Sequence, residues 1–319
     1  MTYRGMKVVA LAGGIGGGKF LRGLVRAVAP RDVTAVVNTG DDLTMHGLRI
    51  CPDLDSVSYW LGGAFDRERG WGRRDETFRA TEELRRFDPD GAWFGLGDLD
   101  LATHLFRTRL LHDGLTLSEV TARVAARFGI AARILPMSDD PVETRIDVVC
   151  LGQELDLHFQ EYWVRRGGRD EVKAVRFVGA AEARPGPGVL EAIRDADAIV
   201  LGPSNPVVSM GPILAVPGVR EAIARKRDVS VGVSGIVAGA PIGGMADRLM
   251  PAVGIEVTAA GVATHYRELI SGFLIDRRDR DLAGRVSALG LRVGATDTVM
   301  TDDARAESVA RSALELLRG

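Results

Sequence analysis

A run of glycines near the start of the chain has the composition of a phosphate-binding segment. Five of the six positions from Gly13 to Gly18 are glycine, and Lys19 follows them. Glycine lets backbone N–H groups approach a phosphate closely, and a helix that begins near Lys19 adds the positive end of its dipole. A tight turn explains one or two glycines but not five. We therefore expect this segment, with Gly13, Gly14, Gly16 and Lys19, to bind a phosphate-bearing ligand.

The glycine segment matches neither of two familiar nucleotide motifs in full. It fits GxxxxGK, but Phe20 stands where a P-loop has the Ser or Thr that holds magnesium. It also contains G-x-G, yet Lys19 stands where the dinucleotide fingerprint has glycine. We expect phosphate binding without ATP hydrolysis. A Rossmann oxidoreductase is disfavoured, also because no acidic residue ends the second apolar run in the usual ribose-binding position.

Four aspartates follow the second apolar run. Asp41 and Asp42 end the segment Asn38-Thr39-Gly40-Asp41-Asp42, and Asp53 and Asp55 lie shortly beyond it. Mg²⁺ binds one or two carboxylates together with phosphate oxygens and water. A single aspartate serves a turn or a helix cap equally well. Two pairs near one strand end favour at least one contact with a metal or a substrate.

Further polar side chains follow other apolar runs. Asp98 and His104 share one segment, in which His104 is either a general base or a packed core histidine. Asp139 follows an apolar run, and Ser204 and Asn205 stand between two prolines. The prolines alone make a rigid turn, so the Ser-Asn pair between them suits a base or a ribose.

Several chemistries are excluded by what the chain lacks. Its five histidines show no HxxxH or HxH spacing, and its two cysteines form no zinc pattern or disulfide framework. There is no G-x-S-x-G elbow for covalent catalysis. The net charge of -2 argues against tight sequence-independent binding to nucleic acid. The inventory favours transfer of a phosphate-linked group by positioning and charge neutralisation.

The elements that position these residues alternate between strands and helices. Apolar residues at 6–12 and 33–37 predict strands, and the spacing over 19–28 predicts a helix between them. The same alternation returns at Ala198–Leu201, Val229–Val233 and Phe273–Ile275. In open sheets of this kind ligands bind beyond the carboxyl ends of the strands, which is where the polar residues lie.

The remaining segments predict additions to this core. Residues from about 53 to 128 are mainly helical, with Thr116 or Ser118 as a helix cap, and Ile146–Val164 alternates like a β-hairpin. We predict an α/β fold: a Rossmann-like, doubly wound, mainly parallel sheet with a helical and β-hairpin insertion. It is one domain over 1–319, with its core at about 6–50 and 190–319 and the insertion at about 53–185.

Location and assembly follow from the same reading. The first apolar run has the length of a strand, so we expect no secretory signal, no membrane span and a cytoplasmic protein. The last helix, about Ala304–Leu317, has apolar residues at helical spacing. That face would suit a dimer interface, and we expect a homodimer.

Seven blocks of residues, in order over nearly the whole chain, resemble the 2-phospho-L-lactate transferases of coenzyme F-420 biosynthesis. The blocks are Gly13-Gly14-x-Gly16, Asn38-Thr39-Gly40-Asp41-Asp42, Pro52-Asp53-Leu54-Asp55, Trp71-Gly72 with Asp75-x-Thr77-Phe78, Leu96-Gly97-Asp98 with Ala102-Thr103-His104, Leu135-Pro136-Met137-Ser138-Asp139-Asp140-Pro141, and Gly202-Pro203-Ser204-Asn205-Pro206.

The resemblance implies a Mg²⁺-dependent transferase of EC class 2.7.8. The donor would be guanosine diphosphate linked to phospholactate, phosphoenolpyruvate or phosphoglycerate. The acceptor would be FO, a deazaflavin with a ribityl chain, and GMP would leave as F-420-0 or its dehydro form is made. Mg²⁺ would lie on Asp41, Asp42 or Asp53. Asp55 would contact FO and orient or deprotonate its hydroxyl, with Asp53 as the second catalytic carboxylate. Ser204-Asn205 would lie at the guanosine end.

The chain departs from the family pattern at the expected acceptor side. Gly95 stands where members often have Arg or Lys, and Leu99 stands where they tend to have Arg. Gly235 and Met245 likewise replace common prolines. Gly95 and Asp139 complete the expected substrate-binding residues. The alternative is a non-enzymatic regulator that binds a nucleotide or sugar nucleotide on the same scaffold; Trp71-Gly72 and the block at 52–55 argue for the transferase.

Overall fold

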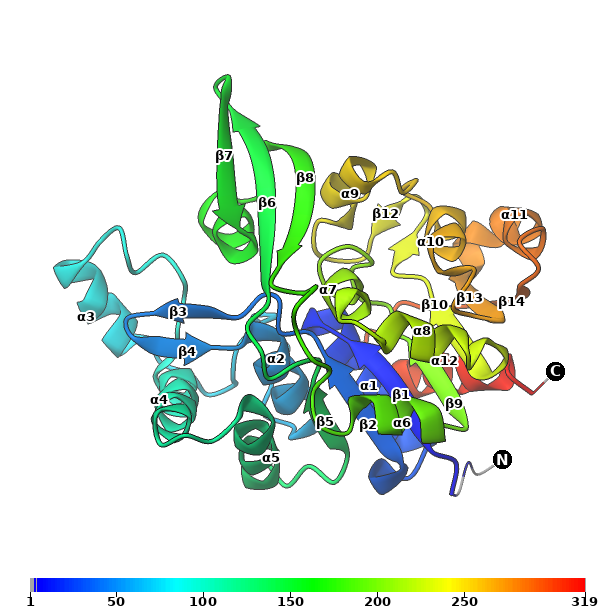
Figure 1. The fold of residues 1–319 in the computed structure, drawn as a ribbon, viewed down its shortest axis with the longest axis horizontal. Helices are drawn as coiled ribbons and strands as arrows, with labels where there is room; N and C mark the ends of the chain where they lie inside the picture. The colour runs from blue at the N-terminus through cyan, green and yellow to red at the C-terminus, as the bar shows by residue number, and fades with distance from the viewer. Residues whose placement is uncertain (1–2, 4, 319) are drawn as a thin grey trace.

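The molecule is built on a parallel sheet of seven strands. The computed structural model describes residue 3 and residues 5–318. The strand order is β14-β13-β10-β9-β1-β2-β5, and every neighbouring pair is parallel (Figure 1). The strands are β1 (Val8–Ala12), β2 (Val33–Val37), β5 (Arg133–Pro136), β9 (Ala198–Leu201), β10 (Ser230–Val233), β13 (Gly272–Asp276) and β14 (Arg292–Thr296). The predicted α/β fold is confirmed.

Both faces of this sheet are covered by helices, which explains the continuous apolar strands. Alternate residues of β1 point to opposite faces, so Val8 and Ala10 belong to one core and Val9 and Leu11 to the other. The first core is covered by α1 (Gly14–Ala27), α2 (Pro52–Leu61), α5 (Leu117–Arg127) and α12 (Asp303–Glu315). The second is covered by α6 (Val189–Asp195), α7 (Met210–Ala215), α8 (Val219–Ala224), α9 (Ala246–Leu249), α10 (Ala259–Tyr266) and α11 (Ala283–Ser287).

Smaller elements project from the sheet. The hairpin of β6 (Glu143–Cys150) and β7 (Gln153–His158) lies where the alternating pattern predicts one. With β8 (Glu171–Val178) it forms an antiparallel sheet that stands away from the core (Figure 1). The other elements are β3 (Leu43–Met45) with β4 (Leu48–Ile50), α3 (Arg79–Phe87), α4 (Asp98–His112), β11 (Ile236–Val237) with β12 (Ala240–Pro241), a π-helical turn at Glu161–Arg165, and 3₁₀ turns at Pro30–Asp32, Arg227–Val229, Pro251–Val253 and Arg277–Leu282.

Helix α1 begins at Gly14, five residues before its expected start. The predicted helix start near Lys19 is therefore wrong, because the glycines before it form the first turns of the helix. Glycine disfavours a helix interior by about 1 kcal/mol, but close packing requires it here. A Cβ at Gly16 would lie 2.8 Å from the carbonyl oxygen of Pro203, and one at Gly18 would collide with Trp60.

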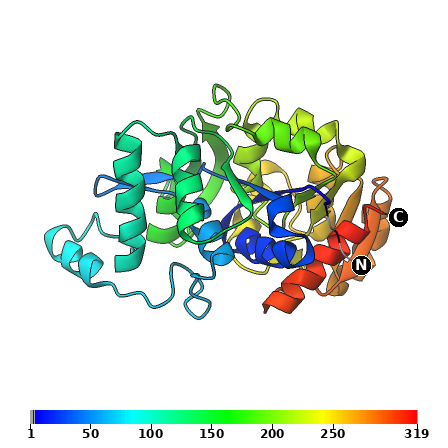
Figure 2. The ribbon, with the colours of Figure 1, turned by 90° about the horizontal axis from the view of Figure 1, so that it is seen from below.

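Two further expectations change. Strand β5 lies within the range 53–185, yet it pairs with β2 in the central sheet, so the expected insertion is divided into two parts. The apolar face of α12, including Val309 and Leu314, is buried against α1 and the sheet, where Figure 2 shows the two helices side by side. That face is therefore not available as a dimer interface. No helix among the described residues has the length and apolar character needed to cross a membrane.

Candidate functional site

The carboxyl ends of β1 and β9 meet at the point where the strand order reverses. Strand β1 continues to β2 on one side and neighbours β9 on the other, so a crevice is expected between these two strands. Gly13 follows β1, and its N–H donates to Ser204 Oγ at 3.2 Å. Ser204 Oγ in turn donates to the carbonyl oxygen of Gly13 at 2.8 Å. Asn205 Oδ1 accepts from the N–H of Val207 at 2.9 Å. Both predicted side chains thus brace the loops of this crevice.

Asp53 caps the first turn of α1. Its Oδ1 accepts from the N–H of Gly14 at 2.7 Å, and its Oδ2 accepts from Asn38 Nδ2 at 2.9 Å. Asn38 Oδ1 accepts from the N–H of Gly40 at 2.8 Å, which fixes the amide. A carboxylate therefore lies at the helix end where the sequence predicts a phosphate. Burial raises the pKa of Asp53 to about 7, against the opposing effect of these hydrogen bonds.

Asp41 and Asp42 are buried next to Asp53. Asp42 Oδ2 pairs with Arg49 at 3.1 Å, and Asp41 Oδ2 accepts from Gln160 Nε2 at 3.4 Å. The other carboxylate oxygen of each is buried without a hydrogen-bond partner in the described part of the chain. Burial raises the pKa of Asp42 to about 6. Burial, followed by the charge of Asp53, raises the pKa of Asp41 well above its usual value.

These three carboxylates have the electrostatics of a site for a hard cation. Unpartnered buried carboxylate oxygens are costly, and a divalent cation offsets both the burial and the mutual repulsion. Mg²⁺ requires only one or two carboxylates when phosphate oxygens and water complete its shell. One or two of Asp41, Asp42 and Asp53 therefore fit the ion predicted from the sequence.

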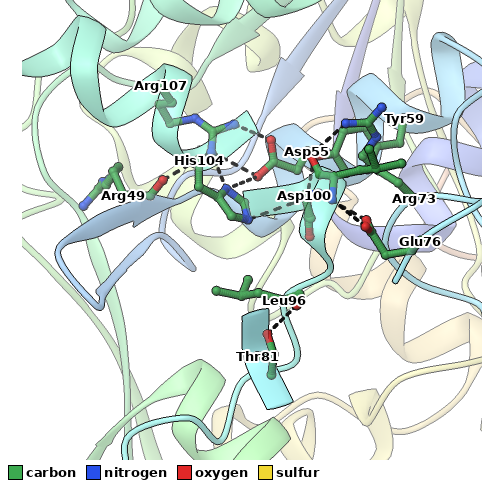
Figure 3. Close-up of polar contacts among 11 residues, drawn as sticks. Arg49, Asp55, Tyr59, Arg73, Glu76, Thr81, Leu96, Asp100, His104 and Arg107 are labelled. Carbon is green, nitrogen blue, oxygen red and sulfur yellow. Dashed lines mark hydrogen bonds and ion pairs between the residues drawn. The ribbon is translucent and has the colours of Figure 1, made fainter. Parts of the chain in front are cut away.

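Asp55 belongs to a different cluster, built mostly on α4. Its carboxylate makes a two-pronged ion pair with Arg107, and Figure 3 shows it facing both Arg107 and His104. Arg107 and His104 are 2% and 1% exposed. Arg107 Nη1 also lies 3.1 Å from His104 Nδ1 and 3.3 Å from the carbonyl oxygen of Arg49. The nearby carboxylate of Asp55 raises the pKa of Arg107 despite its burial.

The geometry of His104 defines its tautomer. A guanidinium only donates, so Nδ1 of His104 accepts from Arg107 and the ring proton lies on Nε2. That nitrogen is 3.6 Å from Asp100 Oδ1, which also accepts from the hydroxyl of Tyr59. Burial acts to raise the pKa of Asp100, but His104 and Tyr59 outweigh it and lower the pKa.

Asp55, Asp100 and His104 could also be read as metal ligands. They each offer a ligand atom within 4.8 Å of the others, and all three are buried. However, Arg107 contacts both oxygens of Asp55 and the Nδ1 of His104. The guanidinium already supplies the positive charge that a cation would bring, and a second cation beside it would be repelled. We therefore assign this cluster no metal.

The start of α4 is held by a reciprocal pair of caps. Glu76 accepts from the N–H groups of Leu99 and Asp100, at 2.5 Å and 3.1 Å, at the first turn of α4. Asp98 accepts from the N–H groups of Arg79 and Ala80, at 3.3 Å and 3.0 Å, at the first turn of α3. A Cβ at residue 97 would collide with the carboxylate of Glu76, so glycine is required there. Two of the motif blocks thus cap each other's helices.

Three expected substrate-binding residues lie away from both carboxylate groups. Lys19 lines a narrow surface pocket with Trp60 and Arg67, its Nζ 5.9 Å from the centre of the Trp60 ring. Burial and the charge of Arg67 lower its pKa. Gly95 packs on Trp71, with its would-be Cβ 3.0 Å from the ring. Asp139 Oδ1 accepts from the N–H of Ser118 at the start of α5. Their roles toward a substrate stay predictions.

The sequence reading missed Arg107 and Gln160 and left His104 undecided. Asp100, His104 and Arg107 have i, i+4 and i+7 spacing, which places all three on one face of a helix. A buried helix face that carries an acid, a histidine and an arginine is unusual, and this spacing could have been noticed. Gln160 gave no local signal, since it reaches Asp41 from the projecting sheet region.

Comparison with known proteins identifies the family of this chain. Residues 8–313 match the model of the 2-phospho-L-lactate transferase CofD family. The chain belongs to this family. It is 52% identical over 312 residues to a phosphoenolpyruvate transferase of Streptomyces griseus, and the match covers 98% of each chain. It is 42% identical to that of Mycolicibacterium smegmatis, again over 98% of each chain.

A solved structure supports the fold. A Bacillus halodurans protein of the UPF0052 family superposes with a TM-score of 0.64 at 19% identity, over 97% of this chain and 99% of that one. At that identity the likeness concerns the fold alone. Membership of the CofD family confirms the resemblance seen in the sequence and makes the chain a transferase, which removes the non-enzymatic regulator from consideration.

Proposed function

We propose that the chain transfers a phosphoenolpyruvyl group from a guanosine diphosphate-linked donor to the deazaflavin FO, with release of GMP. Membership of the CofD family over residues 8–313 carries this proposal. The name of the Streptomyces griseus relative, at 52% identity, favours enolpyruvate over lactate or glycerate as the three-carbon acid. The reversal of strand order beside the buried carboxylates Asp41, Asp42 and Asp53 supports a phosphate-linked donor, because ligands of open α/β sheets bind at such points.

The reaction exchanges one bond to phosphorus for another. The hydroxyl of FO attacks the donor phosphorus distal to guanosine, a new O–P bond forms, and the bond to the GMP phosphate breaks. The hydroxyl proton passes to a carboxylate of the chain. Asp55 is the expected acceptor-side carboxylate that takes this proton. Gly14 would present its N–H group to the donor's diphosphate, whereas the N–H of Gly13 donates to Ser204 Oγ.

One or two of Asp41, Asp42 and Asp53 would hold Mg²⁺. When bound there, the ion supplies positive charge against the diphosphate oxygens, which lowers the barrier to attack. Donor and ion together would draw Asp53 away from the N–H of Gly14, since that group would then serve the donor. The two unpartnered oxygens of Asp41 and Asp42 support this assignment.

The proposal is tested by following GMP. Purified protein with Mg²⁺ and an enolpyruvyl diphosphoguanosine donor should release GMP only when FO is present, and mass spectrometry should find the enolpyruvyl phosphodiester of FO. Equal GMP release without FO contradicts the acceptor. Parallel reactions with the lactyl and glyceryl donors decide the acid, and faster turnover with either one contradicts enolpyruvate.

A further inference from the structure

One residue, Arg49, connects the two carboxylate groups of the site through its side chain and its backbone carbonyl. Asp42 pairs with the guanidinium of Arg49, and the carbonyl oxygen of Arg49 accepts from Arg107, which holds Asp55. The connection runs from β3–β4 through α4 to the first turn of α2. It joins a carboxylate assigned to the cation with the carboxylate assigned to the acceptor, and every link is a direct contact between buried or half-buried groups. Figure 3 shows the part of it that runs from Arg49 through Arg107 to Asp55.

Arg107 is held on several sides. Its Nη1 carries two hydrogens and has three acceptors within 3.3 Å, namely Asp55 Oδ2, His104 Nδ1 and the carbonyl oxygen of Arg49. Its Nη2 donates to Asp55 Oδ1. A planar fork that meets both oxygens of a carboxylate sets the rotation of that carboxylate as well as its charge. Lysine carries the same charge but offers no such fork.

His104 completes this arrangement through its neutral ring. Its Nδ1 accepts from Arg107 on one side, while its Nε2 faces Asp100, which is tied to Tyr59. The ring therefore stands between the guanidinium and a second, anchored carboxylate. His104 is 1% exposed, and the polar neighbours of its ring are Arg107, Asp55 and Asp100.

We infer that Arg107 is a positioning residue that orients the Asp55 carboxylate toward the acceptor hydroxyl and fixes its place relative to Asp42, with the Nδ1 of His104 as the acceptor that holds the guanidinium. This inference rests on the proposed function. A purely structural ion pair would stabilise the fold, but the orientation of Asp55 would not matter for turnover. A substitution that keeps the positive charge but changes the geometry therefore separates the two roles: it lowers turnover only if Arg107 orients Asp55.

The decisive variant is Arg107→Lys, which keeps the charge and removes the fork. We expect kcat/KM for FO to fall about 10–100-fold, since small misplacements of reacting groups have effects of that size, while the affinity for the donor, measured by calorimetry, changes less than about threefold. Arg166→Lys is the matched control, because Arg166 forms a two-pronged pair with Asp170 outside the site. It should stay within about twofold of the unmodified enzyme.

His104 is tested with a pair of variants. His104→Asn retains an oxygen acceptor near the position of Nδ1 and should keep kcat/KM within about fivefold of the unmodified enzyme. His104→Leu removes the acceptor and should lose about as much as Arg107→Lys. Chemical unfolding of each variant at the assay temperature shows that the folded fraction is unchanged, so a loss of activity is not a loss of folded protein.

The outcomes separate two failures. If the unmodified enzyme releases no GMP with FO, the proposed function fails and this inference fails with it. If the unmodified enzyme turns over and Arg107→Lys matches it, or if Arg166→Lys loses as much, only the positioning role is overturned. Equal losses in His104→Asn and His104→Leu would overturn the part assigned to Nδ1.

Discussion

Asp53 and Asp55 lie two residues apart on α2, yet they belong to two groups with opposite electrostatics. Asp53 shares its surroundings with Asp41 and Asp42, in which burial raises all three pKa values. Asp55 faces Arg107, and the pKa of its neighbour Asp100 is lowered. Residues two apart on a helix point in different directions, so one helical turn serves both groups.

The two groups differ in whether the protein itself supplies the positive charge that balances their carboxylates. The group of Asp41, Asp42 and Asp53 has fewer positive partners than negative charges, and it leaves buried oxygens unpartnered. Under the proposed function, a cation from solution would complete it. The group around Asp55 contains its own cation, Arg107, which contacts both oxygens of Asp55, and only Nε2 of His104 lacks a hydrogen-bond partner among the described residues of this group. The carboxylate of Asp55 is therefore held before any ligand arrives. Preorganised polar groups of that kind cost no rearrangement during a reaction.

The largest expected effect comes from removing the charge partner inside the second group. Asp55→Ala leaves Arg107 buried without its carboxylate and should lower the free energy of unfolding by about 3–5 kcal/mol. Transfer to FO should fall by about 10²–10⁴-fold, as when a positioned acid or base is lost. Denaturant unfolding and GMP release measure the two effects. Asp156→Ala is the control, since its exposed pairs with Arg145 and Arg176 are worth less than about 1 kcal/mol.

The first group should make the protein less stable as the pH rises. The pKa of Asp53 is about 7 in the folded chain against 3.8 unfolded. Below pH 3.8 both states are protonated; between these values only the folded state holds the proton, so stability falls with rising pH and levels off above 7. The loss is at most about 4 kcal/mol. Asp53→Asn should reduce the slope between pH 6 and 7; an unchanged slope contradicts the assignment.

A cation should reverse that loss. At pH 8, where Asp41, Asp42 and Asp53 are more ionised, Mg²⁺ at a hundred times its dissociation constant should add about 2.7 kcal/mol to the free energy of unfolding. At pH 5 the gain should be much smaller because protons compete for the carboxylates. Thermal unfolding with and without Mg²⁺ measures it. Asp41→Asn should lose most of the gain, whereas an unchanged gain in that variant would place the ion elsewhere.

The smallest effect concerns the cap that supports the second group. Glu76→Ala removes the acceptor for two N–H groups at the start of α4 and should cost about 1 kcal/mol of stability. Glu76→Gln should cost less, because its amide oxygen can still accept. Urea unfolding compares the two. If the first variant is as stable as the second, the cap does not support α4.

Much of the fold could be predicted because its main strands are buried on both faces and read as continuous apolar runs. Strand β14 gave no such signal, since Arg292 and Gly294 interrupt it at an edge of the sheet. The start of α1 was mistaken because glycine normally indicates a loop. There the need for close contact with Pro203 and Trp60 overrides local preference, and that contact exists only in the folded chain.

The site could be predicted as a set of residue types but not as two separate groups. Asp53 and Asp55 look equivalent in the sequence, and only the packing of α4 brings Arg107 to one of them. The partner of Asp41, Gln160, comes from 119 residues away along the chain. Sequence spacing gives information only about which residues share one helix face. Asp100, His104 and Arg107 of α4 were therefore the one part of the cluster that could have been predicted from spacing.

Because the starts of α3 and α4 cap each other, we expect the two helices to open together in hydrogen exchange of their backbone amides. The N–H of Ala80, in α3, donates to Asp98 at the start of α4. The N–H of Leu99, in α4, donates to Glu76, which precedes α3. If one cap opens, the segment that carries the carboxylate of the other cap is also released. Hydrogen exchange at these two amides should therefore proceed at matched rates, and the cluster around Asp55 should loosen as a whole.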